Sequence, residues 1–571
     1  MLAPPTQSTI LWRVRYLGVC FFLNFFAYSS AQTLESTLNG ASGFMCLSLV
    51  YIAISLSYIV SPYIVSLFGE ARLPSLFFCA ALPYVFMVST KLLPRSPGVA
   101  AVSLLSCAGV GLGGGPLWSA QGFFIARATA AMHAAAPPGD SATPSTISTR
   151  LNSVFFSISM LSGFASNTIA TLVMLSFSDV ASAVRALFSL LTAVGCAGLV
   201  AYSLLPSPGE AGGGVVALPF FLRPGRSKLA AALPAAAGGE PAACPEAPTA
   251  RLVLAGGAPG SAGDAAAPPP APRRGSWIPW PEPEEEAQCA GAGAGAGAGA
   301  PALPPASGAP PEDATVPSPL YMLRFMAATR EVWHVAPVSF AAGAGQGFVT
   351  GAWMAAVVAD TVGADYVGLV GAAFCASSAA CAALWGRLAQ RPAYGRRTAF
   401  ALSHALLLAW YLANAGAWWG GGLSARASAL ALLRAGAGAG AAAQPLAGQQ
   451  LPPPPLPLPL LLPLLLAASV LVAAVDPVFQ AFVSATMQVY FPAKPNLACA
   501  VAAPRFFYGL GFSLQQLLAL SLSAALGRPA IGEQCLLHAA LVCVSAASLW
   551  ALHTRVRPID PPAAAAAPPA G

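Results

Sequence analysis

The sequence predicts an all-α membrane protein with about twelve transmembrane helices in two six-helix halves. Hydrophobic residues make up 56% of the 571 residues, and the mean hydropathy is +0.68. Charged residues make up only 8%, whereas a soluble domain carries roughly 25%. The chain is too apolar for a disordered protein, and it lacks the dense basic patch of a nucleic-acid binder. The remaining class is a polytopic membrane protein whose first partner is the lipid bilayer.

Each half contains six apolar runs long enough to cross a hydrocarbon core of roughly 30 Å, which takes about 20 helical residues. In the first half, residues 14–205, the runs lie near 14–34, 42–67, 73–92, 98–126, 151–176 and 182–205. In the second half, residues 335–553, they lie near 335–359, 365–386, 398–419, 460–490, 496–525 and 531–553. We expect each run to form one transmembrane helix.

A polar segment, residues 206–334, separates the two halves. Between Pro206 and Pro319 it holds 16 of the charged residues and 23 of the 54 prolines, together with long Ala/Gly tracts. Such a composition cannot bury enough apolar surface to build a core. We therefore predict a disordered linker there.

The distribution of Lys and Arg predicts the orientation. If residues 1–13 are cytoplasmic, the short inner loops and the tail, residues 554–571, hold 12 Lys and Arg, and the outer loops hold 6. Because cytoplasmic loops carry an excess of these residues, both termini and the linker are predicted to be cytoplasmic, in a plasma membrane or an endomembrane. Arg13 and Arg15 before an apolar run also fit a signal peptide cleaved near Ala31. The run is long for a signal peptide, which favours an uncleaved first helix.

Six spans, a long polar linker and six more spans are the general plan of a major facilitator protein. The turn between the eighth and ninth spans supports this interpretation, because it resembles the G-x-x-x-D-R-x-G-R-R signature of the major facilitator superfamily. The residues that match are Gly386, Arg391, Gly395, Arg396 and Arg397, with Gln390 in place of the aspartate. Glycine permits a tight turn, and the arginines anchor it at the cytoplasmic face.

Three further stretches give a narrower resemblance. Residues 27–39 in and after the first span, residues 115–122 in the fourth, and Asp476 with Phe479 and Gln480 in the tenth are similar to motifs of the uncoordinated-93 family. Gln480 stands where that family has Asn. The resemblance implies a twelve-helix major facilitator fold. It also implies the regulation or trafficking of ion channels and receptors, not catalysis.

Two classes of function follow. The first is an accessory or trafficking subunit whose partner is a channel or receptor in the membrane. The second is a secondary active transporter of an unknown small solute or ion, in which Glu35 or Asp476 carries a coupling proton or ion. An enzyme is not expected, because no nucleophile–base pair is evident. No cofactor or metal site is expected either, since no Cys-x-x-Cys pair occurs and the histidines are scattered.

Polar residues inside the first and fourth spans form a candidate cavity site. Asn24, Gln32 and Glu35 follow one another at spacings of eight and three in the first span, and Gln121 lies in the fourth. Such spacings place them on roughly one helical face. The alternative is hydrogen bonding between helices, worth about 0.6 kcal/mol per bond. Glu35 also fits a place at the outer headgroup boundary.

Asp476, Gln480 and Arg505 form the second group of candidate coupling residues. An ionised side chain at the bilayer centre costs about 2.5–3.5 kcal/mol on insertion scales, so it needs a partner or a wet cavity. An Asp476–Arg505 ion pair meets that need, and Pro477 is expected to kink the helix beside it. The alternatives are an Arg505 side chain that snorkels to the cytoplasmic headgroups and a neutral Asp476.

Glycines at four-residue spacing predict close helix packing in two spans. They are Gly111 and Gly115 in the fourth span and Gly343, Gly347 and Gly351 in the seventh. The second set also fits a backbone-lined solute path. Residues 109–114 match G-x-G-x-x-G, but a dinucleotide site needs a preceding strand, and here the motif lies inside a hydrophobic span.

Residues 451–466 are almost entirely Leu and Pro. Repeated prolines break a helix interior, so the tenth helix is expected to begin after Pro463. Because pyrimidine-rich codons encode both residues, residues 435–466 are also a candidate for a retained intron or a mispredicted exon.

Overall fold

The computed structural model describes residues 6–94, 96–136, 143–206, 317–389, 395–420, 458–492 and 496–556. Within these ranges the chain is helical, with short turns and no strand. Most of the predicted linker, most of residues 435–466, and the motif residues Gln390 and Arg391 lie outside them.

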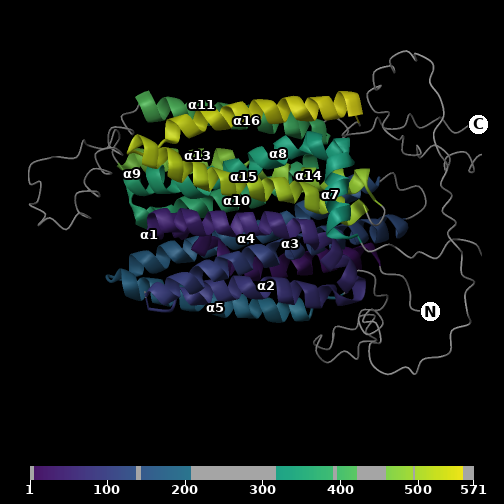
Figure 1. The fold of residues 1–571 in the computed structure, drawn as a ribbon, viewed down its shortest axis with the longest axis horizontal. Helices are drawn as coiled ribbons and strands as arrows, with labels where there is room; N and C mark the ends of the chain where they lie inside the picture. The colour runs from purple at the N-terminus through teal and green to yellow at the C-terminus, as the bar shows by residue number, and fades with distance from the viewer. Residues whose placement is uncertain are drawn as a thin grey trace, which may run out of the picture. The chain divides into compact units, whose positions relative to one another are not determined.

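The first half consists of five helices and one short 3-10 turn (Figure 1). They are α1 (Gln7–Phe68), η1 (Glu70–Arg72), α2 (Leu73–Thr90), α3 (Pro97–Ala134), α4 (Pro144–Ser176) and α5 (Val180–Ser203). Helix α1 is kinked at Gly40, whose φ of 52° is left-handed and favours glycine. The kink divides α1 into two candidate spans, Gln7–Thr37 and Asn39–Phe68, so this half crosses six times. The first helix begins before its predicted start at residue 14.

The second half follows the same plan with more irregular helices. Its elements are α7 (Pro319–Ala328), α8 (Arg330–Gly347), the π-helical η4 (Phe348–Ala359), α9 (Asp360–Val362), η5 (Ala364–Tyr366), α10 (Val367–Leu388), α11 (Arg396–Gly420), α13 (Leu458–Ala473), the π-helical η6 (Val478–Phe482), α14 (Val483–Tyr490), α15 (Asn496–Leu526), α16 (Ile531–Ala551) and η7 (Leu552–Val556). Helix α7 and the start of α8 lie in residues that were predicted to be linker. That part of the prediction is wrong, because Ser318 caps α7 by accepting a hydrogen bond from the amide of Tyr321.

Eleven helices of the described ranges are long and apolar enough to cross a membrane. The continuous helical run from Arg330 to Val362 occupies the place of the seventh span and completes the plan of twelve. Since each half crosses an even number of times, the described chain ends Thr6 and Val556 lie at the same end of the helices. We call this the terminal end, and the other, which includes the kink at Gly40, the opposite end.

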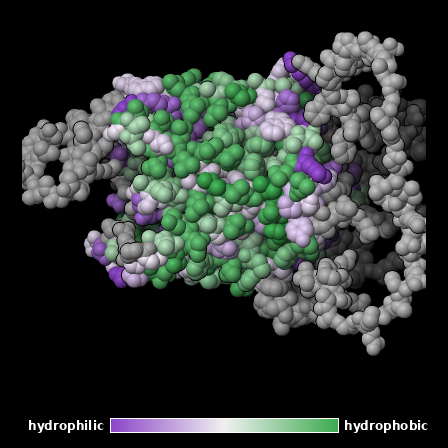
Figure 2. All heavy atoms as spheres, viewed as in Figure 1, coloured by the Kyte–Doolittle hydropathy of each residue, from purple (hydrophilic) through white to green (hydrophobic). Residues whose placement is uncertain are grey.

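The outer surface of the helices is apolar. Figure 2 shows hydrophobic residues over the middle of the helices and hydrophilic residues near both ends. Large apolar side chains are exposed there, among them Leu105 at 75% and Leu56 at 57%. Contiguous apolar surface of this kind marks contact with a membrane or a partner. Together with the helix lengths, it identifies an integral multi-pass membrane protein.

The tenth crossing is interrupted at Pro477. Proline has no amide hydrogen to donate to the carbonyl four residues earlier. That carbonyl, on Ala473, instead accepts a hydrogen bond from Ser378 at 3.1 Å, and the next one, on Ala474, accepts one from Trp385 at 2.8 Å. Helix α10 thus stabilises the kink that the sequence predicts.

The predicted start of this crossing was wrong. Helix α13 begins at Leu458, before Pro463 rather than after it. Pro463 lies within the first two turns, where it removes one backbone hydrogen bond near an end that already has unpaired amides. A proline is therefore tolerated there.

The predicted glycine stripes lie where helices approach closely. On α3, Gly111 and Gly115 face α1, where the Ser57 hydroxyl donates to the Gly111 carbonyl at 3.0 Å and accepts from the Gly115 amide at 3.1 Å. On α8 and η4, the glycines at 343, 347 and 351 face Tyr508, Phe512 and Gln516 of α15. A side chain at Gly111 or Gly343 would overlap the backbone of the neighbouring helix, whereas one at Gly351 would meet the terminal amide of Gln516.

A single methyl group at Gly343 is expected to destabilise the protein. In Gly343→Ala the new Cβ would overlap the backbone carbonyl of Tyr508, and overpacking costs about 1–3 kcal/mol. Gly416→Ala is the matched control, because nothing lies within 4 Å of its Cβ position and Ala is favoured over Gly in a helix by roughly 0.5–1 kcal/mol. Unfolding in SDS should show loss of stability in the first variant only. Equal stabilities would contradict the close contact.

Candidate functional site

A cavity of about 130 Å³ lies between the two halves. Side chains with hydrogen-bonding groups line it from both sides, and the principal ones are Gln32, Tyr51, Asn167, Gln346, Thr350, Gln480, Arg505 and Tyr508. Aromatic rings form much of the remaining wall, and these are Phe25, Tyr28, Tyr58, Tyr84, Trp118 and Phe374. A concave, mainly apolar pocket with a few convergent polar groups is typical of a small-molecule site.

The two halves are hydrogen-bonded to each other on both sides of this cavity. Toward the opposite end, the Ser48 hydroxyl of α1 donates to the Ser513 carbonyl of α15 at 3.1 Å. Toward the terminal end, Gln488 of α14 accepts from Ser148 of α4 at 2.8 Å and donates to the Gly122 carbonyl of α3 at 3.3 Å. The cavity is therefore bounded at both ends by contacts that join the halves.

Asp476 and Arg505 do not form the direct ion pair that was predicted as one of three possibilities. The amide of Gln480 lies between them. Its Nε2 donates to both carboxylate oxygens of Asp476, at 3.2 and 3.1 Å, and its Oε1 accepts from Arg505 Nη1 at 3.2 Å. Since Gln480 follows Asp476 by four residues, one helical turn brings them together. The result is a carboxylate–amide–guanidinium chain that reaches the cavity wall.

Arg505 is held inside the protein and does not snorkel to the headgroups. Its side chain is 7% exposed, and its guanidinium carbon lies 4.7 Å from the ring centroid of Trp118 and 5.6 Å from that of Phe156. A guanidinium over aromatic faces gains cation–π stabilisation. Its Nη2 has no hydrogen-bond partner among the described residues. This nitrogen is thus a buried donor that no described residue satisfies.

Gln346 extends the same network to α8. Its Oε1 accepts hydrogen bonds from the Tyr508 hydroxyl and, at 3.4 Å, from Gln480 Nε2. We did not predict Gln346 from the sequence. The available signal was a lone amide between Gly345 and Gly347 in an apolar span.

The four polar residues predicted to share one site in the first half are separated in the structure. Gln32 lines the cavity and donates to the Tyr51 hydroxyl at 3.1 Å. Asn24 and Gln121 are buried away from the cavity wall, with side-chain atoms that have no partner in the described part of the chain. Glu35 lies elsewhere.

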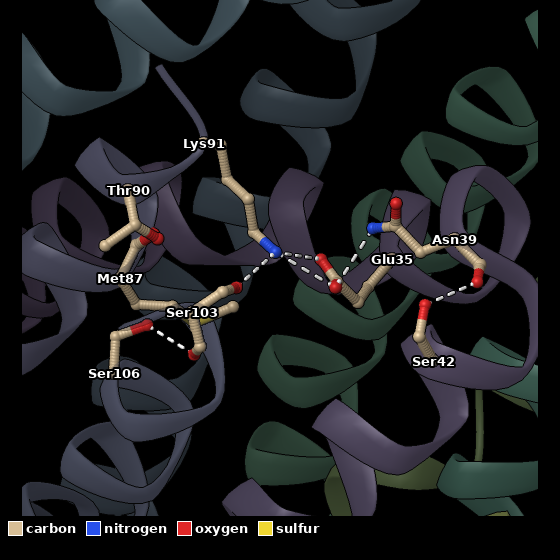
Figure 3. Close-up of polar contacts among 8 residues, drawn as sticks. All are labelled: Glu35, Asn39, Ser42, Met87, Thr90, Lys91, Ser103 and Ser106. Carbon is tan, nitrogen blue, oxygen red and sulfur yellow. Dashed lines mark hydrogen bonds and ion pairs between the residues drawn. The ribbon is translucent and has the colours of Figure 1, made fainter. Parts of the chain in front are cut away.

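Glu35 forms an ion pair with Lys91, the residue that follows the last residue of α2 (Figure 3). The Lys91 ammonium lies 3.0 Å from the carboxylate and 3.2 Å from the Ser103 hydroxyl of α3, and Asn39 donates to Glu35 at 3.0 Å. These residues line a second cavity of about 790 Å³, near the opposite end. Glu35 is only 3% exposed, although it lies near the opposite end, five residues before the kink at Gly40.

The Glu35–Lys91 pair is expected to contribute to stability. Because removing one partner leaves the other charge buried, Glu35→Gln and Lys91→Met should each destabilise the protein. The double variant should lose less stability than the two single losses added together, and the difference, the coupling energy, should be about 1–2 kcal/mol. The Arg528–Glu533 pair, whose side chains are 26% and 32% exposed, is the control, and its coupling should be about 0.5 kcal/mol or less. Unfolding in SDS measures both cycles. Equal coupling energies would show that burial does not strengthen the pair.

No family model matches the chain, and no curated protein matches its sequence. Solved structures do match it. The xylose transporter XylE from E. coli, in a partially occluded inward-open conformation, aligns with a TM-score of 0.51 at 10% identity, over 95% of this chain and 97% of that one. The proton:xylose symporter XylE of the major facilitator superfamily, bound to 6-bromo-6-deoxy-D-glucose, aligns with a TM-score of 0.50 at 12% identity, over 95% and 96%.

The chain has the major facilitator fold. This confirms the fold class predicted from the apolar runs. The narrower resemblance to the uncoordinated-93 family stays a prediction.

Within the major facilitator fold, contacts with other helices hold the described part of the predicted cytoplasmic motif. Arg396 is buried and donates to the Thr486 hydroxyl of α14 at 3.1 Å. Arg397 lies over the Trp550 ring at 5.1 Å. Gly386 of α10 packs directly against Ser153 of α4, in the other half. Gly395 has a positive φ, which suits the tight turn that the motif predicts.

Proposed function

We propose that the protein is a secondary active transporter whose solute binds in the cavity between the two halves. The observation that carries the proposal is that both halves supply polar side chains to one cavity bounded at each end by inter-half contacts. In transporters of this type, one half rocks against the other around a fixed midplane site. Breaking the Ser48–Ser513 contact or the Gln488 contacts in turn would open the cavity to opposite sides.

Asp476 is the proposed coupling group. It is buried, ionisable and placed inside a span, which is the usual position of a proton-relay carboxylate. As a carboxylate it accepts both hydrogen bonds from Gln480. Protonation removes part of this acceptor capacity, which frees the amide to reorient. Because the same amide holds Arg505, proton uptake would change the cavity wall.

Glu35 is less suited to this role than the sequence alone indicated. Its carboxylate is engaged with Lys91 and Asn39, and it lines the second cavity instead of the central one.

The regulatory role implied by the uncoordinated-93 resemblance uses no feature of the central cavity. The two XylE structures belong to a sugar–proton symporter of the same fold, which agrees with transport. We also propose that both termini are cytoplasmic.

Uptake into proteoliposomes tests this function. Vesicles containing the purified protein are given a defined mixture of neutral sugars, amino acids, nucleosides and aromatic and aliphatic monocarboxylates, and their contents are measured by mass spectrometry. At least one solute should enter faster than into protein-free vesicles. Glu533→Gln, at the opposite end and remote from the cavity lining, should behave as wild type. If no solute enters faster, the transporter proposal fails.

A further inference from the structure

We propose that the solute is a small organic monoanion, a carboxylate on a compact apolar or aromatic body, whose charged group binds Arg505. This inference rests on the proposed function, because it names the solute of the same cavity. It begins from charge. Among the described residues that line the cavity, Arg505 is the only one with a full charge at neutral pH. The cavity wall therefore favours an anion over a cation.

The hydrogen bonds of Arg505 also favour an anionic solute. A guanidinium has five donors in a fixed fork and no acceptor, and it matches carboxylate geometry. Here Nη1 is taken by Gln480, whereas Nη2 has no partner among the described residues although the side chain is more than nine-tenths buried. A buried donor without a partner is costly. A carboxylate oxygen in the cavity would satisfy it.

The carboxylate of Asp476 lies farther from the cavity than the guanidinium of Arg505. Asp476 is absent from the lining of the central cavity and lies behind Gln480. The amide therefore separates the protein's own carboxylate from the space where the solute's carboxylate would lie. Arg505 would then have an anionic group on the cavity side and a neutral amide on the other.

The remaining wall fits an apolar or aromatic body. Trp118, Tyr58, Tyr84 and Phe25 are among the rings that line the cavity, and aromatic rings stack favourably against one another. The cavity volume limits the size of the solute. One water-sized group needs about 10–15 Å³ of cavity volume, so a cavity of about 130 Å³ holds a molecule of roughly ten non-hydrogen atoms. Benzoate is of this size. A disaccharide or a nucleotide is too large for the cavity as it stands.

Benzoate and benzamide form a matched pair of probes, because they share a ring and a shape and differ in charge. Binding of each to the purified protein in detergent is measured by calorimetry. Benzoate should bind at least about tenfold more tightly than benzamide, since only its carboxylate can form a hydrogen bond in which both groups are charged. Arg505→Gln should remove this preference, and Arg505→Lys should keep part of it, because lysine retains the charge without the fork.

The wild-type comparison needs no variant, so it decides the matter even if Arg505→Gln fails to fold. Equal affinities for benzoate and benzamide, or no benzoate binding at millimolar concentration, would overturn the proposal. So would an unchanged preference in a folded Arg505→Gln protein. Failure of the anion-site proposal and failure of the transport proposal give different results. Uptake of neutral members of the mixture without benzoate binding leaves transport standing, whereas benzoate binding without any uptake removes transport and keeps the anion site.

Discussion

Gln480→Met is expected to lower the free energy of unfolding by about 5 kcal/mol, because it removes three hydrogen bonds to two buried ionisable groups and leaves these groups without their partner. The methionine side chain has nearly the shape of glutamine but cannot hydrogen-bond as an amide. Asp476 would lose both hydrogen bonds from Gln480, and Arg505 Nη1 would lose its acceptor. Unfolding of the detergent-solubilised protein in SDS measures this change.

Gln488→Met is the matched control for that experiment. Gln488 is buried to a similar degree, and its partners Ser148, Asn152 and the Gly122 carbonyl are all neutral. Loss of neutral hydrogen bonds costs about 1 kcal/mol each. The substitution at Gln480 should therefore cost more. If the two variants are equally stable, the carboxylate–amide–guanidinium chain contributes no more to stability than the neutral hydrogen bonds of Gln488.

Asp476→Asn should abolish the part of solute accumulation that an imposed proton gradient drives. Asparagine keeps the shape of the side chain and an oxygen that accepts from Gln480, but it cannot take up a proton. Solute exchange, which needs no net proton movement, should persist. The measurement compares gradient-driven uptake with counterflow in the same proteoliposomes, using the solute that wild-type vesicles accumulate.

Two controls define the result for Asp476. Glu533→Gln removes a carboxylate at the opposite end and should leave both activities unchanged. Glu35→Gln should reduce stability without removing gradient dependence, because Glu35 lines the second cavity. Gradient-driven accumulation that survives in Asp476→Asn would show that another group carries the proton.

The sequence predicted the helices well because apolar runs of sufficient length have few alternatives in a bilayer. It predicted the cavity less well, because lining a cavity depends on which helix face points inward. Asn24 and Gln32 illustrate the difference. Eight residues at 3.6 per turn leave an offset of about 80°, which is enough to bury Asn24 against neighbouring helices while Gln32 reaches the cavity.

Contacts between residues far apart in the chain also could not be predicted from the sequence. Nothing in the pattern around Glu35 indicates Lys91, which lies 56 residues later. The role of Gln480 as a bridge depends on where α15 places Arg505 relative to the kinked helix. By contrast, the kink itself followed directly from Pro477, since the missing amide hydrogen is a local property of the chain.

Access to Cys375 tests the central claim, alternating access to the cavity, most directly. Cys375 of α10 lines the cavity, and a variant that keeps it alone among the 12 cysteines carries a single reporter. The anionic, membrane-impermeant thiol reagent 2-sulfonatoethyl methanethiosulfonate is applied from either side of oriented vesicles, with a cysteine-free protein as control. We expect Cys375 to be modified from both sides, and more slowly when benzoate is present. Modification from one side only, or from neither, would contradict the account.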